Sequence, residues 1–541
     1  MSYRLILGAL LFLCPAGGCS DDGGQVLLDG GADLARDAPP VSDGPSILAP
    51  GQFRDFVASA AGVVEGTLTT GGDETLILLL ISLDPTPLKA YPYTTTAVTA
   101  TSGTLDLPAF GGEGDAGRRI ERRPCRFQQE LERIIASKPR RLYAPKQYLA
   151  AGVPPKVGDQ RSFNVEGQTI TAEALLVDSA AAYWVDKTTQ PQATVDPQML
   201  KDLSHGFGEV VVPRERVYFG QESDLDGDGH IAVLFSPLVS QSGAMAYVSP
   251  CDLLDPKTVP TCASSNQAEI LYAPPPSDLP SYMGSATAQL ELFAHELQHA
   301  IYFFRKFVSK NSLAGAENPY LHEGMSDLAA DLSGYNLGLI HRFKAGLDGV
   351  DSLSVPNLTT DTITSYVPGD GDGLMRGGAD LLLRYLFDQA GGDDIDASGT
   401  PKDKGGIKWL RSYVDDTELG EKSILGTAGL SLEQLTKQFW TALALSNRGP
   451  SYGPLNPDPR YNFLPVAPDP VTGNNRGLNL YATVKSTKLM GPRIQSFTKP
   501  DGSLRAGGAE LLQLVVNGKL LRFAVKTKPE AKAMVRVIRT R

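Results

Sequence analysis

Histidine, cysteine, positive charge and long apolar runs are all scarce in this chain. It has six histidines and five cysteines in 541 residues, and the cysteines do not have the spacing of a zinc finger. The net charge of −11 argues against nucleic acid as a partner. No stretch, including the apolar run at the N-terminus, has the roughly 18 consecutive apolar residues of a membrane-spanning helix. These absences exclude a membrane-spanning mature chain and make a nucleic-acid-binding protein a poor hypothesis.

Two of the six histidines stand four residues apart in the run His295-Glu296-Leu297-Gln298-His299. On a helix, residues four apart project from one face, as two ligands of a tetrahedral zinc ion require. The glutamate beside the first histidine is then placed to act as a general base. The run therefore predicts His295 and His299 as zinc ligands and Glu296 as the catalytic base.

The residues around this run support a helix. Apolar side chains recur three or four positions apart and form one stripe, and the two histidines fall on the opposite side. We therefore expect one face of the helix to pack into a core and the other to face a cleft. The stripe consists of Leu290, Phe293, Leu297, Ile301, Phe304 and Val308.

A third zinc ligand is needed, and its identity separates the classes of zinc peptidase. The metzincin pattern is absent, because Tyr302 and Arg305 stand where that pattern has glycine and histidine. Asn318, followed by proline, suits the start of a second helix, on which Glu323 and Asp327 share one face. This pair predicts a carboxylate ligand, Glu323, and a second acid, Asp327, that orients a ligand histidine.

These residues resemble the hyicolysin family of bacterial metallopeptidases, which belongs to the gluzincins, the thermolysin-like clan. The stretches that carry the resemblance are residues 218–221, 224–229, 294–300 and 320–331. The resemblance covers roughly residues 175–450 and implies a thermolysin-like zinc-peptidase domain. It also implies His295, His299 and Glu323 as zinc ligands and Glu296 as the general base.

The chain departs from the family pattern at two positions. The residue before the ligand glutamate is usually asparagine, and here it is His322, which we expect to be a partly exposed helix histidine rather than a ligand. The alternative is that His322 contacts substrate or a residue that orients a ligand. Where relatives tend to have a tyrosine just before a glycine to stabilise the oxyanion, this chain has Arg376. Arg376 and Tyr366, in the preceding loop, are the candidates for the oxyanion role, and the alternative is that both are surface residues.

Asp224, Asp226 and Asp228, followed by glycine, have the ligand spacing with which a calcium loop begins. Phe235 occupies the twelfth position, where an EF-hand has glutamate, and residues 231–235 predict a buried strand. The run is therefore either a loop-then-strand calcium site or an Asp/Gly turn without an ion. We favour calcium, because three carboxylates at alternate positions repel one another without a cation.

The N-terminus has the features of an export signal. Arg4 precedes an apolar run that ends at Cys14 and is too short to span a bilayer. Small residues before Cys19 resemble a bacterial lipobox, which would make Cys19 a lipidation site; a plain secretory signal is the alternative. In an exported protein, Cys251 and Cys262 are expected to form a disulfide. We therefore expect an outer-membrane or cell-surface lipoprotein, or a secreted protein, that contacts a membrane only through a lipid anchor.

A basic stretch lies at residues 118–141. We interpret it as the solvated face of an amphipathic helix whose apolar side contains Phe127, Leu131 and Ile134. The alternative is a cleavable joint between a prodomain and a protease, because exposed arginines invite proteolysis.

Composition and pattern together predict an α+β fold with a β-rich N-terminal domain and a C-terminal β-sandwich on either side of the peptidase domain. The predicted segments are a signal peptide (residues 1–18), a disordered acidic tether (19–46), a small β domain (47–115), a joining region (116–174), a zinc metallopeptidase domain (175–455) and the β-sandwich (470–541).

The predicted function is that of a zinc-dependent metallopeptidase that cleaves protein or peptide substrates outside a bacterial cell. Gly243-Ala244-Met245-Ala246-Tyr247 resembles an aminopeptidase motif but has alanine where that motif has glutamate, which favours endopeptidase activity. One alternative is a catalytically weak or inactive surface binding or adhesion lipoprotein on a peptidase scaffold. Another is an amidase or other non-peptide hydrolase.

Overall fold

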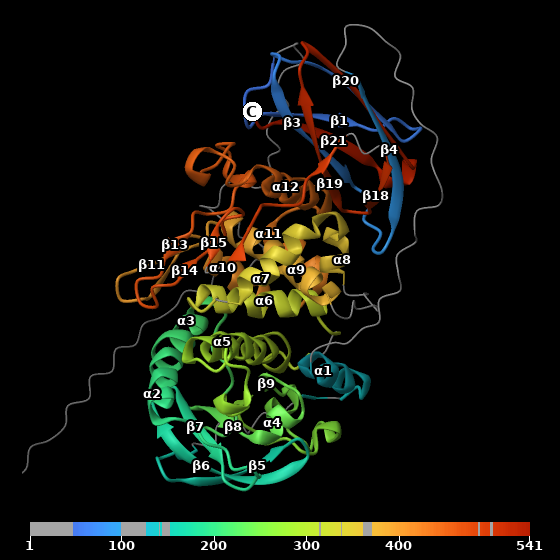
Figure 1. The fold of residues 1–541 in the computed structure, drawn as a ribbon. Coiled ribbons are helices and arrows are strands. Elements are labelled where there is room, and N and C mark those ends of the chain that lie inside the picture. Colours follow the sequence, from blue (N-terminus) through green and yellow to red (C-terminus); the bar gives the residue numbers. More distant parts are fainter. Residues whose placement is uncertain are drawn as a thin grey trace, which may run out of the picture.

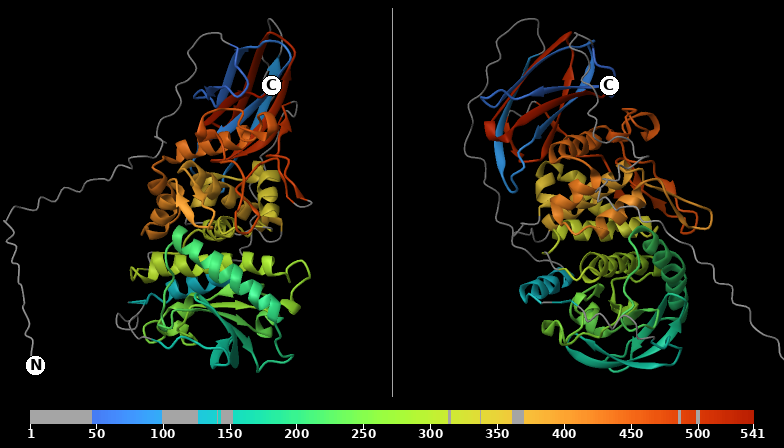
Figure 2. Two further views of the ribbon diagram at one scale, coloured as in Figure 1. Left: turned by 90° about the vertical axis from the view of Figure 1, so that its left-hand side faces the viewer. Right: turned by 180° about the vertical axis from the view of Figure 1, so that it is seen from behind.

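The structure is a computed structural model that describes residues 47–98, 126–139, 141–142, 152–312, 315–336, 338–360, 370–484, 487–497 and 501–541. Its fold is of mixed α+β class, as predicted. Figures 1 and 2 show three parts: a lower lobe built on a sheet, a layer of helices above it, and two further sheets at the far end. The predicted signal peptide, the tether and Cys19 lie outside the described residues. Within the described ranges, no helix is both long enough and apolar enough to cross a membrane.

The lower lobe contains a six-stranded sheet in the order β5-β6-β7-β8-β10-β9. Strands β7, β8 and β10 pair in parallel, whereas β5, β6 and the short edge strand β9 pair antiparallel with their neighbours. The strands are β5 (Gln160–Val165), β6 (Gln168–Val177), β7 (Ala181–Asp186), β8 (Ile231–Phe235), β9 (Tyr247–Val248) and β10 (Ile270–Ala273). The helices of this lobe are α1 (Arg126–Ala136), α2 (Pro197–Gly206), α3 (Val212–Tyr218), α4 (Pro237–Gln241) and α5 (Ala286–Phe303).

Strand β8 is buried on both faces, which explains its uninterrupted apolar sequence. Val233 and Phe235 pack in the core that includes α5, whereas Leu234 belongs to a separate core on the other face of the sheet. Residues 231–235 therefore form the buried strand predicted from the sequence. Helix α5 lies above the sheet in Figure 1, on the side of the lower lobe that faces the helical layer.

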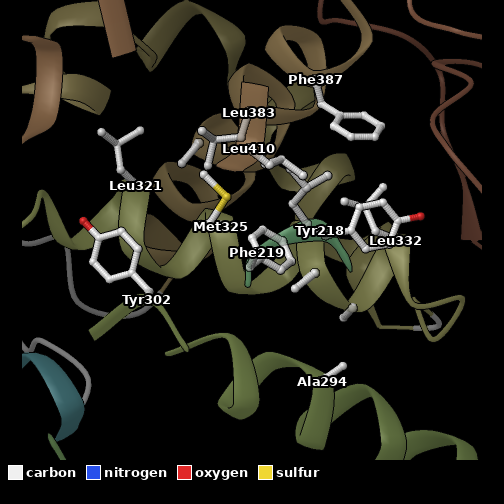
Figure 3. Packing of buried hydrophobic residues seen from close by; sticks show 14 of the residues in the cluster. Tyr218, Phe219, Ala294, Tyr302, Leu321, Met325, Leu332, Leu383, Phe387 and Leu410 are labelled. Atoms are coloured by element: carbon white, nitrogen blue, oxygen red, sulfur yellow. The ribbon is translucent and has the colours of Figure 1, made fainter. Parts of the chain in front are cut away.

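The helical layer begins with α6, where the sequence predicts a helix start. Asn318 accepts hydrogen bonds through Oδ1 from the backbone N–H groups of Tyr320 (2.8 Å) and Leu321 (3.2 Å), and Pro319 occupies the first helical position. The helices of the layer are α6 (Pro319–Leu332), α7 (Leu339–Asp348), α8 (Val355–Thr359), α9 (Asp370–Gln389), α10 (Gly406–Asp415), α11 (Gly420–Ala428) and α12 (Leu432–Leu445). Figure 3 shows Met325 of α6 among Leu383 of α9, Leu410 of α10 and Phe219, so α6 is packed from several sides.

The two ends of the chain form one sandwich of two sheets, and this corrects the prediction of two separate β domains. The sheets have the orders β1-β21-β3-β19-β17 and β18-β4-β20-β2, so strands from residues 53–98 alternate with strands from residues 495–539, except that the short β17 pairs with β19. The N-terminal strands are β1 (Phe53–Val57), β2 (Val63–Thr69), β3 (Glu74–Ser82) and β4 (Ala90–Val98). The C-terminal strands are β17 (Gln495–Ser496), β18 (Asp501–Arg505), β19 (Ala509–Val516), β20 (Leu520–Thr527) and β21 (Ala533–Arg539).

Strand β3 connects this sandwich to the helical layer. All nine of its residues are buried. Ile77, Leu79 and Ile81 belong to the large core shared with the helices, whereas the leucines that alternate with them lie in the core between the two sheets. Because β3 pairs with both β19 and β21, removal of the N-terminal strands would leave the C-terminal strands without their central partner.

The predicted joining region belongs largely to the lower lobe, which is a second correction. Strand β5 and most of β6 lie in its sheet, so the boundary predicted at residue 175 falls inside β6. Helix α1 lies in the same region, and its Phe127, Leu131 and Ile134 are buried as the amphipathic pattern predicts. What the pattern does not indicate is that this helix packs beside α5 and β9, as Figure 1 shows.

Short two-stranded ribbons complete the fold. One of them, β13–β14, is held by Asp469, whose carboxylate accepts from Nη1 (2.7 Å) and Nη2 (3.1 Å) of the buried Arg214. Cys251 and Cys262 form a disulfide in the lower lobe. The ribbon strands are β11 (Asp393–Ile395), β12 (Pro401–Asp403), β13 (Ala467–Pro468), β14 (Asn475–Arg476), β15 (Thr483–Val484) and β16 (Thr487–Lys488).

Candidate metal centre

Helix α5 presents the two histidines of the motif toward α6. Ser285 caps the helix by accepting from the Ala288 N–H (3.3 Å). His295 and His299 are 9% and 2% exposed, so the face that carries them is buried as well as the apolar face. The regular helix ends at Phe303, and a π-helical turn follows over Phe304–Val308. The predicted contrast between a core face and an open cleft face is therefore weaker than expected, because α6 covers part of the second face.

Glu323 reaches the two histidines from α6. His295 Nε2 lies 3.4 Å from Glu323 Oε2, and His299 Nε2 lies 3.7 Å from Glu323 Oε1. One donor atom from each of the three residues lies within 4.8 Å of the donor atoms of the other two. Ligand atoms around a tetrahedral zinc ion with bonds of about 2.1 Å lie about 3.4 Å apart. The three side chains are therefore spaced as a zinc ion would need them.

The other ring nitrogen of His295 is held by Asp327. His295 Nδ1 lies 2.8 Å from Asp327 Oδ1. A proton on Nδ1 leaves the Nε2 lone pair directed at the point shared with Glu323. Asp327 thus occupies the position that the sequence assigns to it.

His299 is held by Ser326, which the sequence did not identify, and by His322, for which contact with the site was the alternative interpretation. Ser326 Oγ donates to Gln298 Oε1 (2.6 Å) and lies 2.9 Å from His299 Nδ1, whose N–H it accepts. His322 Nε2 lies 3.1 Å from the same nitrogen. The prediction that His322 is partly exposed is wrong, since it is 1% exposed. Ser326 follows Glu323 by three positions on α6, so the two side chains project from the same side of the helix. That spacing was the sequence signal from which the contact of Ser326 with the site could have been predicted.

Burial keeps His299 neutral and raises the pKa of Glu296. The pKa of His299 lies well below its usual value, because burial and the neighbouring histidines oppose a positive charge. Burial raises the pKa of Glu296 to about 7, and the negative charge of Glu323 adds to this effect. Glu296 Oε2 accepts a hydrogen bond from the Val248 N–H of strand β9 at 3.1 Å. Glu296 therefore lies between the three predicted ligands and the edge of the sheet, and it is not part of the group that could hold a metal.

Two arginines hold the carboxylates of α6. Arg376 Nη2 lies 2.7 Å from Glu323 Oε2 and 3.5 Å from Asp327 Oδ2, and Arg342 forms an ion pair with Asp327. Although burial opposes it, the Arg376 guanidinium helps to hold the pKa of Glu323 well below its usual range. Arg376 was a candidate for the oxyanion role, with a surface residue as the alternative, and in the structure it pairs with the carboxylate of Glu323, the predicted third ligand. Tyr366, the other candidate, lies outside the described residues.

These side chains line an open cleft of about 1020 Å³. Residues of α1, of the segment 282–292 and of the segment 338–342 line the cleft. The segment Ser242–Tyr247 also lines it, so Ala246 stands at the cleft where the resembling aminopeptidase motif has glutamate. Strand β9 begins at the last residue of this segment and is one of the two edge strands of the lower sheet.

The predicted calcium residues are only partly brought together. Asp224 and Asp226 approach each other, but the third member of the group is Glu269, at the start of β10. Asp228 instead accepts from the His230 N–H (2.8 Å). Arg161 Nη1 lies 2.9 Å from Asp226 Oδ2. Its positive charge offsets part of the repulsion between the carboxylates, which the sequence prediction had left to a calcium ion. Glu269 was missed because its distance along the chain leaves no local pattern.

No protein-family model matches the chain, and no curated protein matches its sequence. The interpretation of the site therefore depends on its own residues and their geometry.

Proposed function

We propose that this protein is a zinc-dependent metallopeptidase of the gluzincin, thermolysin-like type, acting as an endopeptidase. One observation carries the proposal: His295, His299 and Glu323 converge from two helices, and the non-ligand Glu296 lies beside them in an open cleft. Two histidines and one glutamate, with room for water or substrate, form the ligand set of catalytic zinc sites. A structural zinc site would have a fourth protein ligand instead.

The residues present fit a zinc ion. Glu323 Oε1 is buried and has no hydrogen-bond partner among the described residues, as expected for an atom that awaits a cation. Both histidines have their Nδ1 atoms occupied by other side chains, which leaves the Nε2 atoms for the metal. When bound, zinc would supply the Lewis acidity that activates water and polarises a carbonyl.

The residues of the chain would perform the proton transfers and the positioning. Glu296 takes a proton from the attacking water and later delivers it to the leaving amine. The Val248 N–H orients the Glu296 carboxylate at 3.1 Å. Strand β9 is the last strand of the sheet beside this carboxylate, where an extended peptide can lie alongside it. Ala246 supplies no carboxylate for a free substrate amine, which supports internal cleavage.

The test is a comparison of two glutamates on α5. Glu296→Gln should retain zinc and lose cleavage of casein by a factor of about 10² to 10⁴, since it removes only the proton acceptor. Glu291→Gln is the matched control, because Glu291 lines the same cleft but accepts hydrogen bonds from the Gly338 N–H (2.9 and 3.0 Å) instead of facing the ligands. A wild-type chain that holds zinc but cleaves none of a varied set of proteins would contradict the proposal.

The second candidate is a binding or adhesion protein on an inactive peptidase scaffold. It is favoured by the position of Arg376, whose Nη2 lies 2.7 Å from a ligand oxygen of Glu323 and not at an open oxyanion position. Zinc content without turnover in the experiment above would select this candidate.

We further propose that the protein acts outside a bacterial cell, as a lipoprotein anchored at Cys19 or as a secreted enzyme. The disulfide between Cys251 and Cys262 supports an oxidising compartment. Metabolic labelling with a fatty acid should be lost in Cys19→Ser if the chain is lipidated. Labelling of neither the wild type nor the variant would leave secretion as the explanation for export.

A further inference from the structure

Helix α1 is a fixed wall of the cleft. Its apolar face is buried, with Phe127, Leu131 and Ile134 at 2%, 0% and 0% exposure. The Phe127 ring stacks on the ring of His299, with centroids 5.1 Å apart and planes 17° apart. The helix is thus in contact with a predicted metal ligand. Its neighbouring face, which includes Arg126, Glu130 and Arg133, lines the cleft together with Phe127.

The acidic groups on this wall are already satisfied. Glu130 accepts from Arg126 through Oε1 (3.3 Å) and from Ser249 Oγ through Oε2 (2.6 Å). Glu166 forms an ion pair with Arg126, whose guanidinium also lies over the Tyr247 ring at 3.8 Å from its centroid. The positive charge of Arg126 is therefore paired with the carboxylates of Glu130 and Glu166.

Arg133 differs from the other arginines of the cleft. Arg342 and Arg376 are engaged by Asp327 and Glu323. Arg133 is exposed and, among the described residues, takes part in no ion pair. A guanidinium that lines a cleft with its donors directed to solvent is suited to bind a carboxylate.

We propose that Arg133 is a specificity-determining residue, which selects substrates with an acidic side chain at the position that reaches α1. This inference rests on the proposed peptidase function, because it supposes that a peptide lies along the cleft. The chemical class of substrate is then a peptide with aspartate or glutamate on the His299 side of the metal.

The test measures the binding of peptide hydroxamates to the zinc-loaded full chain, since these probes need the metal but no turnover. Each position on either side of the hydroxamate is varied between glutamate, glutamine and lysine. At one position, the wild type should bind the glutamate probe about threefold to tenfold more tightly than the lysine probe, as expected when an exposed ion pair replaces a repulsion. Arg133→Glu should reverse this order, and Arg133→Lys should keep it.

Lys138→Glu is the control, because it makes the same change of charge just beyond α1, at an exposed residue that does not line the cleft. It should leave the order of the probes as in the wild type. Equal binding of the glutamate and lysine probes at every position, or an unchanged order in Arg133→Glu, would overturn the inference. Probe selection by Arg133 without cleavage of any protein would instead refute only the proposed enzymatic activity, and absence of zinc and probe binding would refute both.

Discussion

Replacement of Asp327 by asparagine should weaken zinc binding without removing a ligand. Asp327 is 3% exposed, and its Oδ1 accepts the His295 Nδ1–H at 2.8 Å. Asparagine still offers an oxygen of the same size, but the hydrogen bond is no longer charge-assisted and is about half as strong. A charge-assisted bond contributes about 1.5–3 kcal/mol, so the loss is about 0.75–1.5 kcal/mol, or about threefold to tenfold in affinity. Because asparagine is neutral, the Arg376 guanidinium, which otherwise interacts with both carboxylates, would also interact more strongly with Glu323.

The assay is a zinc titration of metal-free protein in competition with a chromophoric chelator, combined with thermal unfolding of the metal-free forms. Asp331→Asn is the matched control, because Asp331 is fully buried one turn farther along α6. Its Oδ2 accepts from Arg384 Nη1 at 2.6 Å instead of from a metal ligand. Both variants should lower the unfolding temperature, since each weakens a buried ion pair. Only Asp327→Asn should lower zinc affinity; equal affinities in this variant and the wild type, or an equal loss in Asp331→Asn, would refute the reasoning.

Two further predictions concern calcium and pH. Calcium should raise the unfolding temperature of the wild type and of Asp228→Asn but not that of Glu269→Gln. The reason is that Glu269, and not Asp228, completes the acidic group with Asp224 and Asp226. The opposite pattern in a thermal-shift titration would favour the three aspartates predicted from the sequence. Burial raises the pKa of Asp252 from 3.8 to about 7, so its contribution is fully present below about pH 4 and is lost as the pH rises toward 7. Asp252→Asn should flatten the fall of unfolding free energy over that range by up to about 1.4 kcal/mol per pH unit, measured by urea unfolding, and parallel profiles for the two proteins would contradict it.

The parts of the site that were predicted depend on residues close together in the sequence. His295 and His299 are one helical turn apart, and Asn318 marks the start of α6 through its own side chain and the proline that follows. The spacing of Glu323 and Asp327 follows from the same helix. Such patterns are readable because helix geometry converts sequence spacing directly into direction.

The parts that were missed depend on segments far apart in the chain. His322 has the sequence pattern of a helix surface, but Phe127, almost two hundred residues earlier, covers it with ring centroids 4.8 Å apart. Glu269 joins Asp224 because β10 pairs in parallel with β8, which the Asp-rich loop precedes. Neither contact has a local signature, and burial of a polar side chain is set by the tertiary partner that covers it.

The sandwich shows the same limit and also explains why α1 can serve as a wall. Its strands were individually recognisable, but β3 pairs with β21 through residues such as Leu78 and Val537, which are hundreds of positions apart. Because β3 lies at the centre of its sheet, the chain that precedes α1 is tied to the C-terminus. The chain that follows α1 enters the sheet of the lower lobe at β5. Helix α1 therefore lies between two anchored parts of the fold, and its buried apolar face fixes it a third time. These attachments indicate that α1 is a permanent element of the cleft and does not belong to a segment that is removed with a prodomain.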